Sequence, residues 1–348
     1  STPLYSSAAS DVYKRQNDGY PILWDGYNSW ADIGMSDRSK PSLKTPSDTA
    51  TAGQQANPYQ ITTAAELAWF AYQVNNVDGQ SGICGELKAD ISLFGEQYTG
   101  STYVPGDNAG LSRALNWIPI GYKQTTKPYT GIFQGNGHTV SDMRIARYSA
   151  EPPDRRVAGI FGSLSTGAEI YDLALSNGWL DLGYNQGGIT GMIEGTGVVI
   201  KNCRNTGSLT LNGSTGGGIV GQIVEEAAVV VIRSCWNSGN IMTGSSSFVA
   251  GIVGECDTQK LYLEGCYTTA GSRVGDPATM VTGGIVGGTG TRDVSRPEFK
   301  IKNCYNLGTV EGQNAGGIMG GAAIHLGDQA ITNCYNAGTV TVSGGDKK

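Results

Sequence analysis

The segments VIKNCRN (199–205), VIRSCWN (231–237) and KIKNCYN (300–306) share one pattern: an apolar leader, a small polar residue two positions later, and then cysteine. Four more segments fit it: TVSDMRI (139–145), EIYDLAL (169–175), YLEGCYT (262–268) and AITNCYN (330–336). The seven leaders are spaced 30, 30, 32, 31, 38 and 30 residues apart: Val140, Ile170, Ile200, Ile232, Leu263, Ile301 and Ile331. A fixed period near 30 residues is typical of a solenoid.

A glycine-rich element recurs in step with the leaders. Its seven copies are GIFQG at Gly131, GIFGS at Gly159, GITGM at Gly188, GIVGQ at Gly218, GIVGE at Gly251, GIVGG at Gly284 and GIMGG at Gly317. Each unit therefore contains at least two short strands, because β-branched residues are bounded by Gly, Asn and Ser and helical periodicity is absent. The sequence predicts an all-β fold, a right-handed parallel β-helix of about seven coils of roughly 30 residues.

The positions after the leader predict a bend and then a core residue. Two residues after the leader, the copies carry types that tolerate a left-handed backbone: Asp142, Asp172, Asn202, Ser234, Gly265, Asn303 and Asn333. The next position interchanges Met, Leu and Cys, which indicates an apolar core with stacked, buried thiols: Met143, Leu173, Cys203, Cys235, Cys266, Cys304 and Cys334. Two residues further on, we expect an asparagine ladder between coils: Asn205, Asn237, Asn306 and Asn336.

One helix is expected, over residues 60–76, at the start of the solenoid. Thr63 and Glu66 have the spacing of a capping box, and Leu67, Phe70, Ala71 and Val74 form one apolar face. A helix at this place would cover the open end of the first coil. Strands near 87–93 and 117–120 are expected to begin the solenoid.

The chain divides into four parts. Residues 1–16, STPLYSSAASDVYKRQ, resemble a translated sequencing adapter, so we treat them as an artefactual leader and expect a metagenomic source. Residues 17–35 are expected to be the remnant of a preceding repeat domain. Residues 36–57, rich in Ser, Thr, Pro and Asp, are expected to be a linker. Residues 58–348 are the β-helix, which we expect to be truncated at its C-terminal end.

Composition excludes several classes of function. The net charge of -6 is spread along the chain without a Lys/Arg cluster, so we expect no nucleic-acid partner. No apolar run approaches the roughly 18 residues that a membrane span needs. The seven cysteines form no CxxC motif, and we expect no metal and no cofactor. Cys84 and Cys256 lie outside the repeat. The sequence leaves open whether two stacked cysteines form a disulfide.

The repeated G-G-I-V-G followed by I-x-N-C-Y-N-x-G resembles the GLUG motif of bacterial surface proteins, from about Gln60 to the end of the chain. NPYQITTAAELAWFAYQVN (57–75) resembles the usual entry helix, while NWIPIG (116–121) and GIFQGNGHTV (131–140) resemble the first coils. NDGYPILW (17–24) resembles the closing segment of a preceding unit. The resemblance implies a secreted or cell-wall-attached protein of adhesin type. Some relatives carry an immunoglobulin A-cleaving metallopeptidase domain, whose HExxH motif this sequence lacks.

Catalytic chemistry has little support in the sequence. His138 and His325 are the only histidines, and neither has a ligand neighbour at metal spacing. Polysaccharide lyases also use parallel β-helices, so a glycan-active enzyme is the alternative function. The local charge clusters are Glu225 with Glu226 and the run 154–156, and both fit solvated loops. The insertion 289–297 in the long unit is a candidate binding loop.

The candidate binding residues follow the core cysteine, where strand alternation directs them outward. They are Trp236, Tyr267, Tyr305 and Tyr335, with Arg204 at the equivalent position one coil earlier. An outward ladder of rings is a platform for sugars or a partner, or alternatively a stack that stabilises the rod. We therefore expect a noncatalytic extracellular stalk or adhesive module whose partner is a host glycan, mucin or another cell-surface protein.

Overall fold

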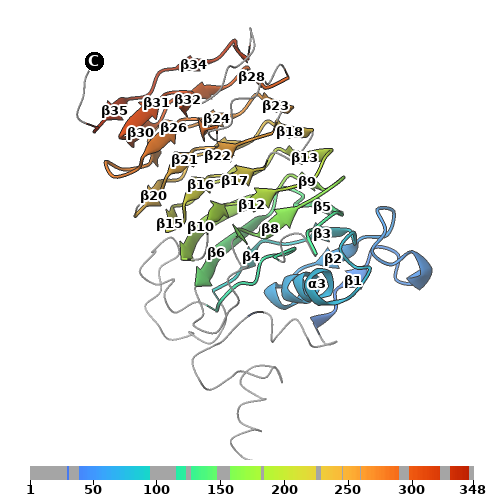
Figure 1. The fold of residues 1–348 in the computed structure, drawn as a ribbon. Helices are drawn as coiled ribbons and strands as arrows, with labels where there is room; N and C mark the ends of the chain where they lie inside the picture. The colour runs from blue at the N-terminus through green and yellow to red at the C-terminus, as the bar shows by residue number, and fades with distance from the viewer. Residues whose placement is uncertain are drawn as a thin grey trace, which may run out of the picture.

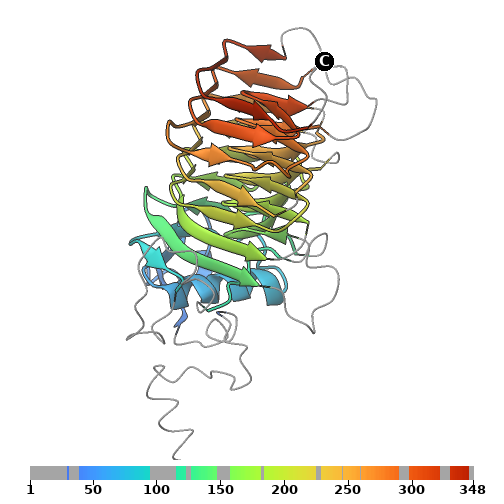
Figure 2. The same cartoon turned by 90° about the vertical axis from the view of Figure 1, so that its left-hand side faces the viewer.

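A computed structural model describes the fold. It describes residues 30, 39–94, 115–122, 127–146, 157–181, 184–224, 229–244, 246–258, 260–289, 298–321 and 330–344. The chain coils into a β-solenoid whose layers stack along one axis, with helix α3 (Ala64–Asn76) at the N-terminal end and the C-terminus at the other (Figures 1 and 2). The predicted parallel β-helix is confirmed.

The leader segments form one sheet, here called the leader sheet. Successive strands are parallel and in register, except that β1 is antiparallel to β2. Its order is β1 (Ser42–Leu43), β2 (Tyr59–Ile61), β3 (Gly85–Leu87), β5 (Ile132–Gln134), β9 (Glu169–Tyr171), β13 (Val198–Lys201), β18 (Val230–Arg233), β23 (Leu261–Glu264), β28 (Lys300–Lys302) and β33 (Ile331–Thr332).

The strands after the bend form a second sheet, the aromatic sheet. In the early coils, β6 (Thr139–Ala146) and β10 (Ala174–Asp181) span its width, and β4 (Ile91–Ser92) pairs with β6. Later coils split into two short strands. The first arm is β14 (Arg204–Asn205), β19 (Trp236–Asn237), β24 (Tyr267–Thr268), β29 (Tyr305–Asn306) and β34 (Tyr335–Asn336); the second is β15 (Leu209–Leu211), β20 (Ile241–Thr243), β25 (Arg273–Val274), β30 (Thr309–Gly312) and β35 (Val340–Val342).

The glycine-rich elements build two six-stranded sheets. The first glycine sheet contains β7 (Val157–Ala158), β11 (Asn185–Gly187), β16 (Thr215–Gly217), β21 (Phe248–Ala250), β26 (Val281–Gly283) and β31 (Asn314–Gly316). The second contains β8 (Phe161–Leu164), β12 (Thr190–Ile193), β17 (Val220–Ile223), β22 (Val253–Cys256), β27 (Val286–Gly288) and β32 (Met319–Gly321).

The two glycine sheets pack at backbone distance. A Cβ placed on Gly221 would lie 2.5 Å from the carbonyl oxygen of Gly191 and 2.6 Å from the backbone nitrogen of Gln186. Gly254, one coil later, meets the carbonyl oxygen of Gly216 at 2.6 Å. Real Cβ atoms do not approach backbone this closely, so the sequence requires glycine here.

The strands of the first coil pair with the second coil in a register that differs from the repeat alignment of the sequence analysis. Phe133, not Val140, lies opposite Ile170, and Val140 lies opposite Leu175. The copy GIFQG at Gly131 therefore belongs to the leader sheet, which leaves six copies for the glycine sheets. Each early coil has two left-handed bends, and the alignment matched Asp142 (φ 58°), a second bend, with Asp172 (φ 53°), a first bend.

The predicted left-handed bends and buried core residues are confirmed, except that Asp142 and Met143 belong to a second bend and lie outside the column that begins with Leu173. All seven bend residues have a positive φ, between 52° and 64°: Asp142, Asp172, Asn202, Ser234, Gly265, Asn303 and Asn333. At the next position, Met143, Leu173 and the cysteines up to Cys304 are fully buried, while Cys334 in the last described coil is half-buried.

Helix α3 covers the entry end as predicted. Its capping box is present, with Glu66 N–H donating to Thr63 Oγ1 at 3.2 Å. Phe70 is fully buried and packs edge-on to Phe133, with ring centroids 5.6 Å apart. Asn75, also buried, donates to the carbonyl of Pro119 (3.0 Å) and accepts from the N–H of Gly121 (2.8 Å). These contacts fix the helix to the start of the solenoid.

Two segments near the entry differ from expectation. Residues 39–57 of the expected linker are folded: β1 pairs with β2, and the short helix η2 (Thr49–Thr51) lies between them in the chain. The buried Asn57 side chain organises this segment by bonding the backbone of Thr45 and Asp48, a role that composition does not reveal. Residues 117–120 form no strand; instead Asn116 and Ile120 make isolated parallel bridges to Arg144 and Phe161.

Candidate functional site

The predicted aromatic residues form a continuous stack, here called the aromatic column. Ring centroids are 5.9 Å apart for Trp236 and Tyr267, 4.8 Å for Tyr267 and Tyr305, and 5.2 Å for Tyr305 and Tyr335. The interplanar angles lie between 7° and 10°, so the rings are parallel. Parallel register of β19, β24, β29 and β34 places them one above another.

Stacking decides which parts of these rings face solvent. The faces of Tyr267 and Tyr305 are each covered by a neighbouring ring, and the rings are only half-exposed. Burial, followed by the neighbouring tyrosines, raises the pKa of Tyr305. Tyr335, at the end of the column, is 54% exposed. Arg204 shares this register, and its guanidinium donates to the carbonyl of Gly137 at 2.8 Å.

Beneath the rings, cysteine thiols form an internal column. Each thiol donates to the leader carbonyl of the previous coil; for example, Cys235 Sγ lies 3.7 Å from the Ile200 oxygen and Cys266 Sγ 3.8 Å from the Ile232 oxygen. All seven cysteines are free, Cys84 and Cys256 included. Burial raises the pKa of the Cys235 thiol, which disfavours the reactive thiolate. The column is structural.

The predicted asparagine ladder is present in two pieces. Asn205 Nδ2 donates to Asn237 Oδ1 at 2.7 Å, and Asn306 Nδ2 donates to Asn336 Oδ1 at 2.7 Å. Thr268 interrupts the ladder and donates instead to the carbonyl of Gly284 at 2.6 Å. These residues are buried apart from Asn336, so they bond coil to coil.

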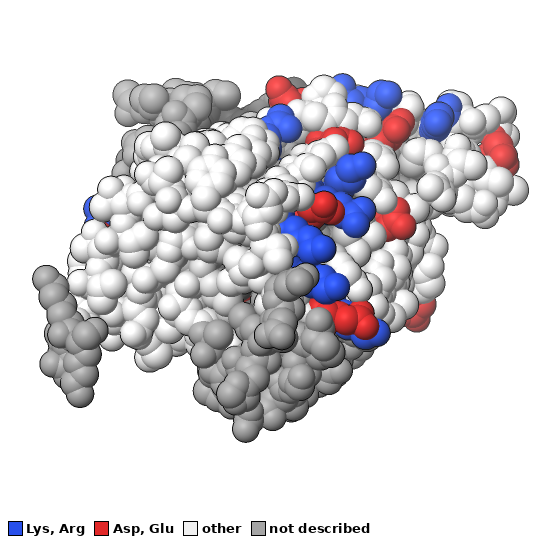
Figure 3. Space-filling model, turned by 90° about the horizontal axis from the view of Figure 1, so that it is seen from above, with Lys and Arg blue, Asp and Glu red and all other residues white. Residues whose placement is uncertain are grey.

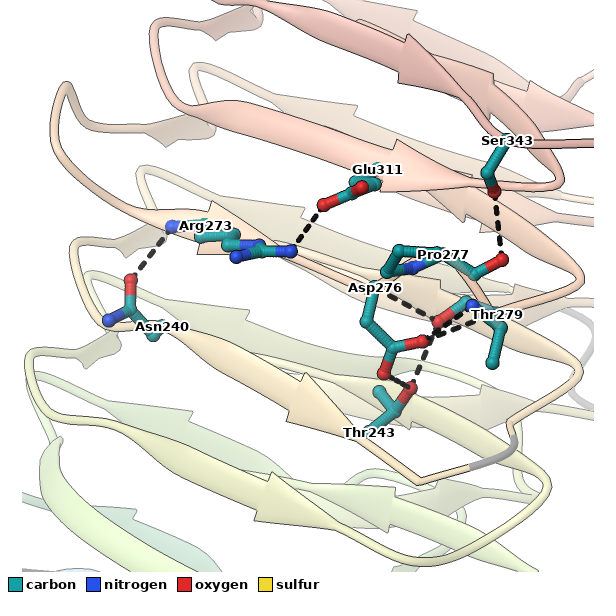
Figure 4. A network of polar contacts seen from close by, with 9 residues as sticks. Asn240, Thr243, Arg273, Asp276, Pro277, Thr279, Glu311 and Ser343 are labelled. Atoms are coloured by element: carbon teal, nitrogen blue, oxygen red, sulfur yellow. Dashed lines mark hydrogen bonds and ion pairs between the residues drawn. The ribbon is translucent and has the colours of Figure 1, made fainter.

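A polar network also links coils at the second arm of the aromatic sheet (Figure 4). Arg273 pairs with Glu311 in the next coil, and its N–H donates to Asn240 Oδ1 at 2.9 Å. The Asp276 carboxylate accepts from Thr243 Oγ1 at 3.0 Å and from the backbone N–H of residue 278 at 2.8 Å. Each residue labelled in Figure 4 makes at least one of the contacts drawn there, among them the bond from Ser343 Oγ to the Pro277 carbonyl, which indicates a structural clip between coils.

The leader sheet carries a line of charged side chains that the sequence analysis did not single out. The outward residue just before the bend is Lys201, Arg233, Glu264 or Lys302 in four successive coils, in parallel register. Seen from above, charged side chains gather in a band on the side of the molecule that this sheet forms (Figure 3). The signal was present in the repeats, at the position between the leader and the bend residue.

One carboxyl with a perturbed pKa was also missed. Burial, with a smaller contribution from Asp257, raises the pKa of Glu255 to about 7. Gln222 Nε2 donates to Glu255 Oε2 at 3.0 Å from the preceding coil. The two residues occupy the same place in GIVGQ and GIVGE, so the repeat alignment could have paired them.

Of the remaining candidates, His138 lies within the described residues. His138 Nδ1 lies 3.2 Å from Asp90 Oδ1, beside the backbone N–H of Thr139, which donates to the same carboxylate. His325, the pair 225–226, the run 154–156 and residues 290–297 lie outside the described residues. Within the described ranges, no group of three or more His, Cys, Asp or Glu could hold a metal ion. No described helix is long and apolar enough to cross a membrane.

Comparisons with known proteins support the fold more than a function. No family model matches the chain. Over 165 residues, 47% of this chain, it is 27% identical to halomucin of Haloquadratum walsbyi, of whose length that match covers 2%. Its fold is similar to the crystal structure of a Bacteroides ovatus protein titled a "putative immunoglobulin A1 protease", with a TM-score of 0.59 and 18% identity over 84% of this chain and 79% of that chain. At this identity, the likeness shows a shared fold alone.

Proposed function

We propose that this chain is a noncatalytic, extracellular β-helix segment of a surface protein that acts as a stalk with an adhesive side. The observation that carries the proposal is the continuity of side-chain columns from coil to coil. Rings, thiols and amides at the repeat positions have their partners in neighbouring coils, as in the stack of Tyr267 on Tyr305. Such a rod spaces other domains and presents one long lateral surface.

The extracellular setting is supported by two likenesses of different kinds. The repeat resembles a motif of bacterial surface proteins, and a stretch of the chain is similar to a protein named halomucin. The adhesive part of the proposal assigns the partner to a host glycan, mucin or another cell-surface protein. The aromatic column, with Tyr335 at its exposed end, is one candidate surface for such a partner.

Incubation of the purified chain with a panel of glycans tests this function. We expect binding without turnover, so mass spectrometry should detect no shortened or unsaturated sugar products. Cleavage of any glycan would overturn the noncatalytic role and favour the glycan-active alternative. A variant with Trp236, Tyr267, Tyr305 and Tyr335 changed to Ala, checked for folding by circular dichroism, reports whether the aromatic column is the adhesive side.

A further inference from the structure

The outer face of the leader sheet differs from the aromatic column in how its side chains are paired. Lys201, Arg233 and Lys302 are exposed, and Glu264 between them is half-exposed. Arg233 pairs with Glu264, with Nε and Oε2 3.3 Å apart. Within the described ranges, no carboxylate lies at ion-pair distance from Lys201 or Lys302. Two cations at the ends of this line therefore remain free to meet an anion.

Two tyrosines flank the cations, and both are held by carboxylates. Tyr171 OH donates to Glu169 at 2.6 Å, and Tyr262 OH donates to Glu298 at 2.9 Å. Burial, then the bond to Glu169, raises the pKa of Tyr171 to about 12, so this hydroxyl stays protonated. Neither ring stacks on another aromatic ring of the described chain, whereas Tyr267 and Tyr305 do. The outer face of the leader sheet thus offers ring faces that no other described ring covers, whereas in the aromatic column neighbouring rings cover them.

The spacing of these groups suits a polymer that runs along the rod. Tyr171, Lys201, Arg233, Glu264 and Lys302 occupy one register position in five successive coils. Neighbouring strands lie about 4.8 Å apart, so the line extends roughly 19 Å in a straight file. A compact ligand would contact only one or two of these side chains, whereas a linear chain can contact them all.

We propose that the outer face of the leader sheet binds a linear anionic polysaccharide along the axis of the rod. Lys201, Arg233 and Lys302 would pair with its carboxylate or sulfate groups, and the Tyr171 and Tyr262 rings would contact sugar faces. The carboxylates of Glu169 and Glu298 already accept hydrogen bonds from tyrosine hydroxyls and can accept them from sugar hydroxyls, whereas Glu264 occupies Arg233 and repels an anion. The same carboxylates disfavour a nucleic acid, whose charges are closely spaced. This inference rests on the adhesive part of the proposed function and names its ligand class.

Binding of polygalacturonate to the full chain, measured by biolayer interferometry at 20 and 300 mM NaCl, tests the inference, with neutral dextran as reference. The triple variant Lys201→Ala, Arg233→Ala, Lys302→Ala should raise Kd at least tenfold. A matched variant, Lys40→Ala, Lys44→Ala, Lys127→Ala, removes the same charge elsewhere and should change Kd less than twofold. Glu264→Gln removes a repulsive carboxylate and should tighten binding. Higher salt should weaken binding, because exposed charges are screened.

Three outcomes would overturn the inference: no binding at low salt, equal losses in the two triple variants, or weaker binding by Glu264→Gln. Circular dichroism of each variant separates loss of binding from loss of folding. The binding mixtures are also assayed for sugar products. Product formation with intact binding would contradict the noncatalytic function alone, while absent binding without products would contradict only the leader-face site.

Discussion

The side-chain columns and the glycine sheets hold the same coils together by different means. In the columns, a ring, a thiol or an amide contacts its counterpart in the next coil, as Asn205 contacts Asn237 at 2.7 Å. In the glycine sheets, backbone meets backbone, and a Cβ on Gly221 would lie 2.5 Å from a carbonyl oxygen. The columns therefore depend on what the side chain supplies, and the glycine sheets depend on its absence.

This difference explains what the repeats tolerate. The core column accepts Leu173 or cysteine, because both fill apolar space. The amide column accepts Thr268 in place of asparagine, because its hydroxyl also finds a carbonyl. The position of Gly221 is glycine in every copy of the second glycine sheet, from GIFGS to GIMGG. A column can change its chemistry, whereas the glycine contact cannot gain an atom.

The largest effect should come from adding a methyl group to the glycine contact. In Gly221→Ala, the new Cβ would clash with backbone, which cannot rotate away, so we expect a loss of about 3 kcal/mol or more in the free energy of unfolding. Gly321→Ala in the same sheet is the matched control, because its nearest neighbour is a side-chain methyl group of Val281 at 3.2 Å. Urea unfolding measures both. Equal losses in the two variants would contradict backbone packing as the cause.

Next in size is the amide column. Asn237→Ala removes the acceptor of one Asn205 N–H and the donor to the Gly239 carbonyl, and we expect a loss of about 2 kcal/mol. Asn237→Thr should lose less, because Thr268 already occupies this position in the next coil. If threonine costs as much as alanine in urea unfolding, then hydrogen bonding is not what this column requires.

The stability of the fold should depend on pH through Glu255, whose carboxyl lies in the second glycine sheet and has a raised pKa. Because the pKa of Glu255 is raised to about 7 in the folded chain, its contribution to stability is present below about pH 4.5 and is lost as the pH rises through 7. After allowance for partial exposure, we expect a change of about 1 to 2 kcal/mol. Glu255→Gln should remove this part of the pH profile of thermal unfolding. If the profile is unchanged in Glu255→Gln, then other groups cause this pH dependence.

The aromatic column should show an effect of similar size at its centre and the smallest effect at its exposed end. Tyr305→Ala removes a ring stacked on both faces, and we expect a loss of about 1 to 2 kcal/mol. Tyr335→Ala removes a half-exposed ring with one stacked face, so its loss should be below about 1 kcal/mol. Urea midpoints that rank these variants in the opposite order would argue against stacking as the source of the stability.

Sequence predicted the fold well wherever one residue type carries one physical requirement. The seven bend residues and the buried thiols followed from left-handed tolerance and apolar interchange. The first coil was misaligned because its two bends look alike in sequence, and Asn57 was missed because its contacts are with backbone. The aromatic stack was predicted as one of two alternatives, and ring geometry was needed to establish it. The sequence analysis did not single out the line of charged side chains on the leader sheet, because Lys, Arg and Glu replace one another at that position.

The most direct test of the central claim, that repeat side chains act between coils, is a double-mutant cycle on Tyr267 and Tyr305. Their rings are 4.8 Å apart and nearly parallel, so we predict a coupling free energy of about 0.5 to 1.5 kcal/mol from urea unfolding of Tyr267→Ala, Tyr305→Ala and the double variant. The same cycle on Tyr267 and Tyr171, which lie on different sheets, should give additive losses. Additive losses for the stacked pair would contradict the account.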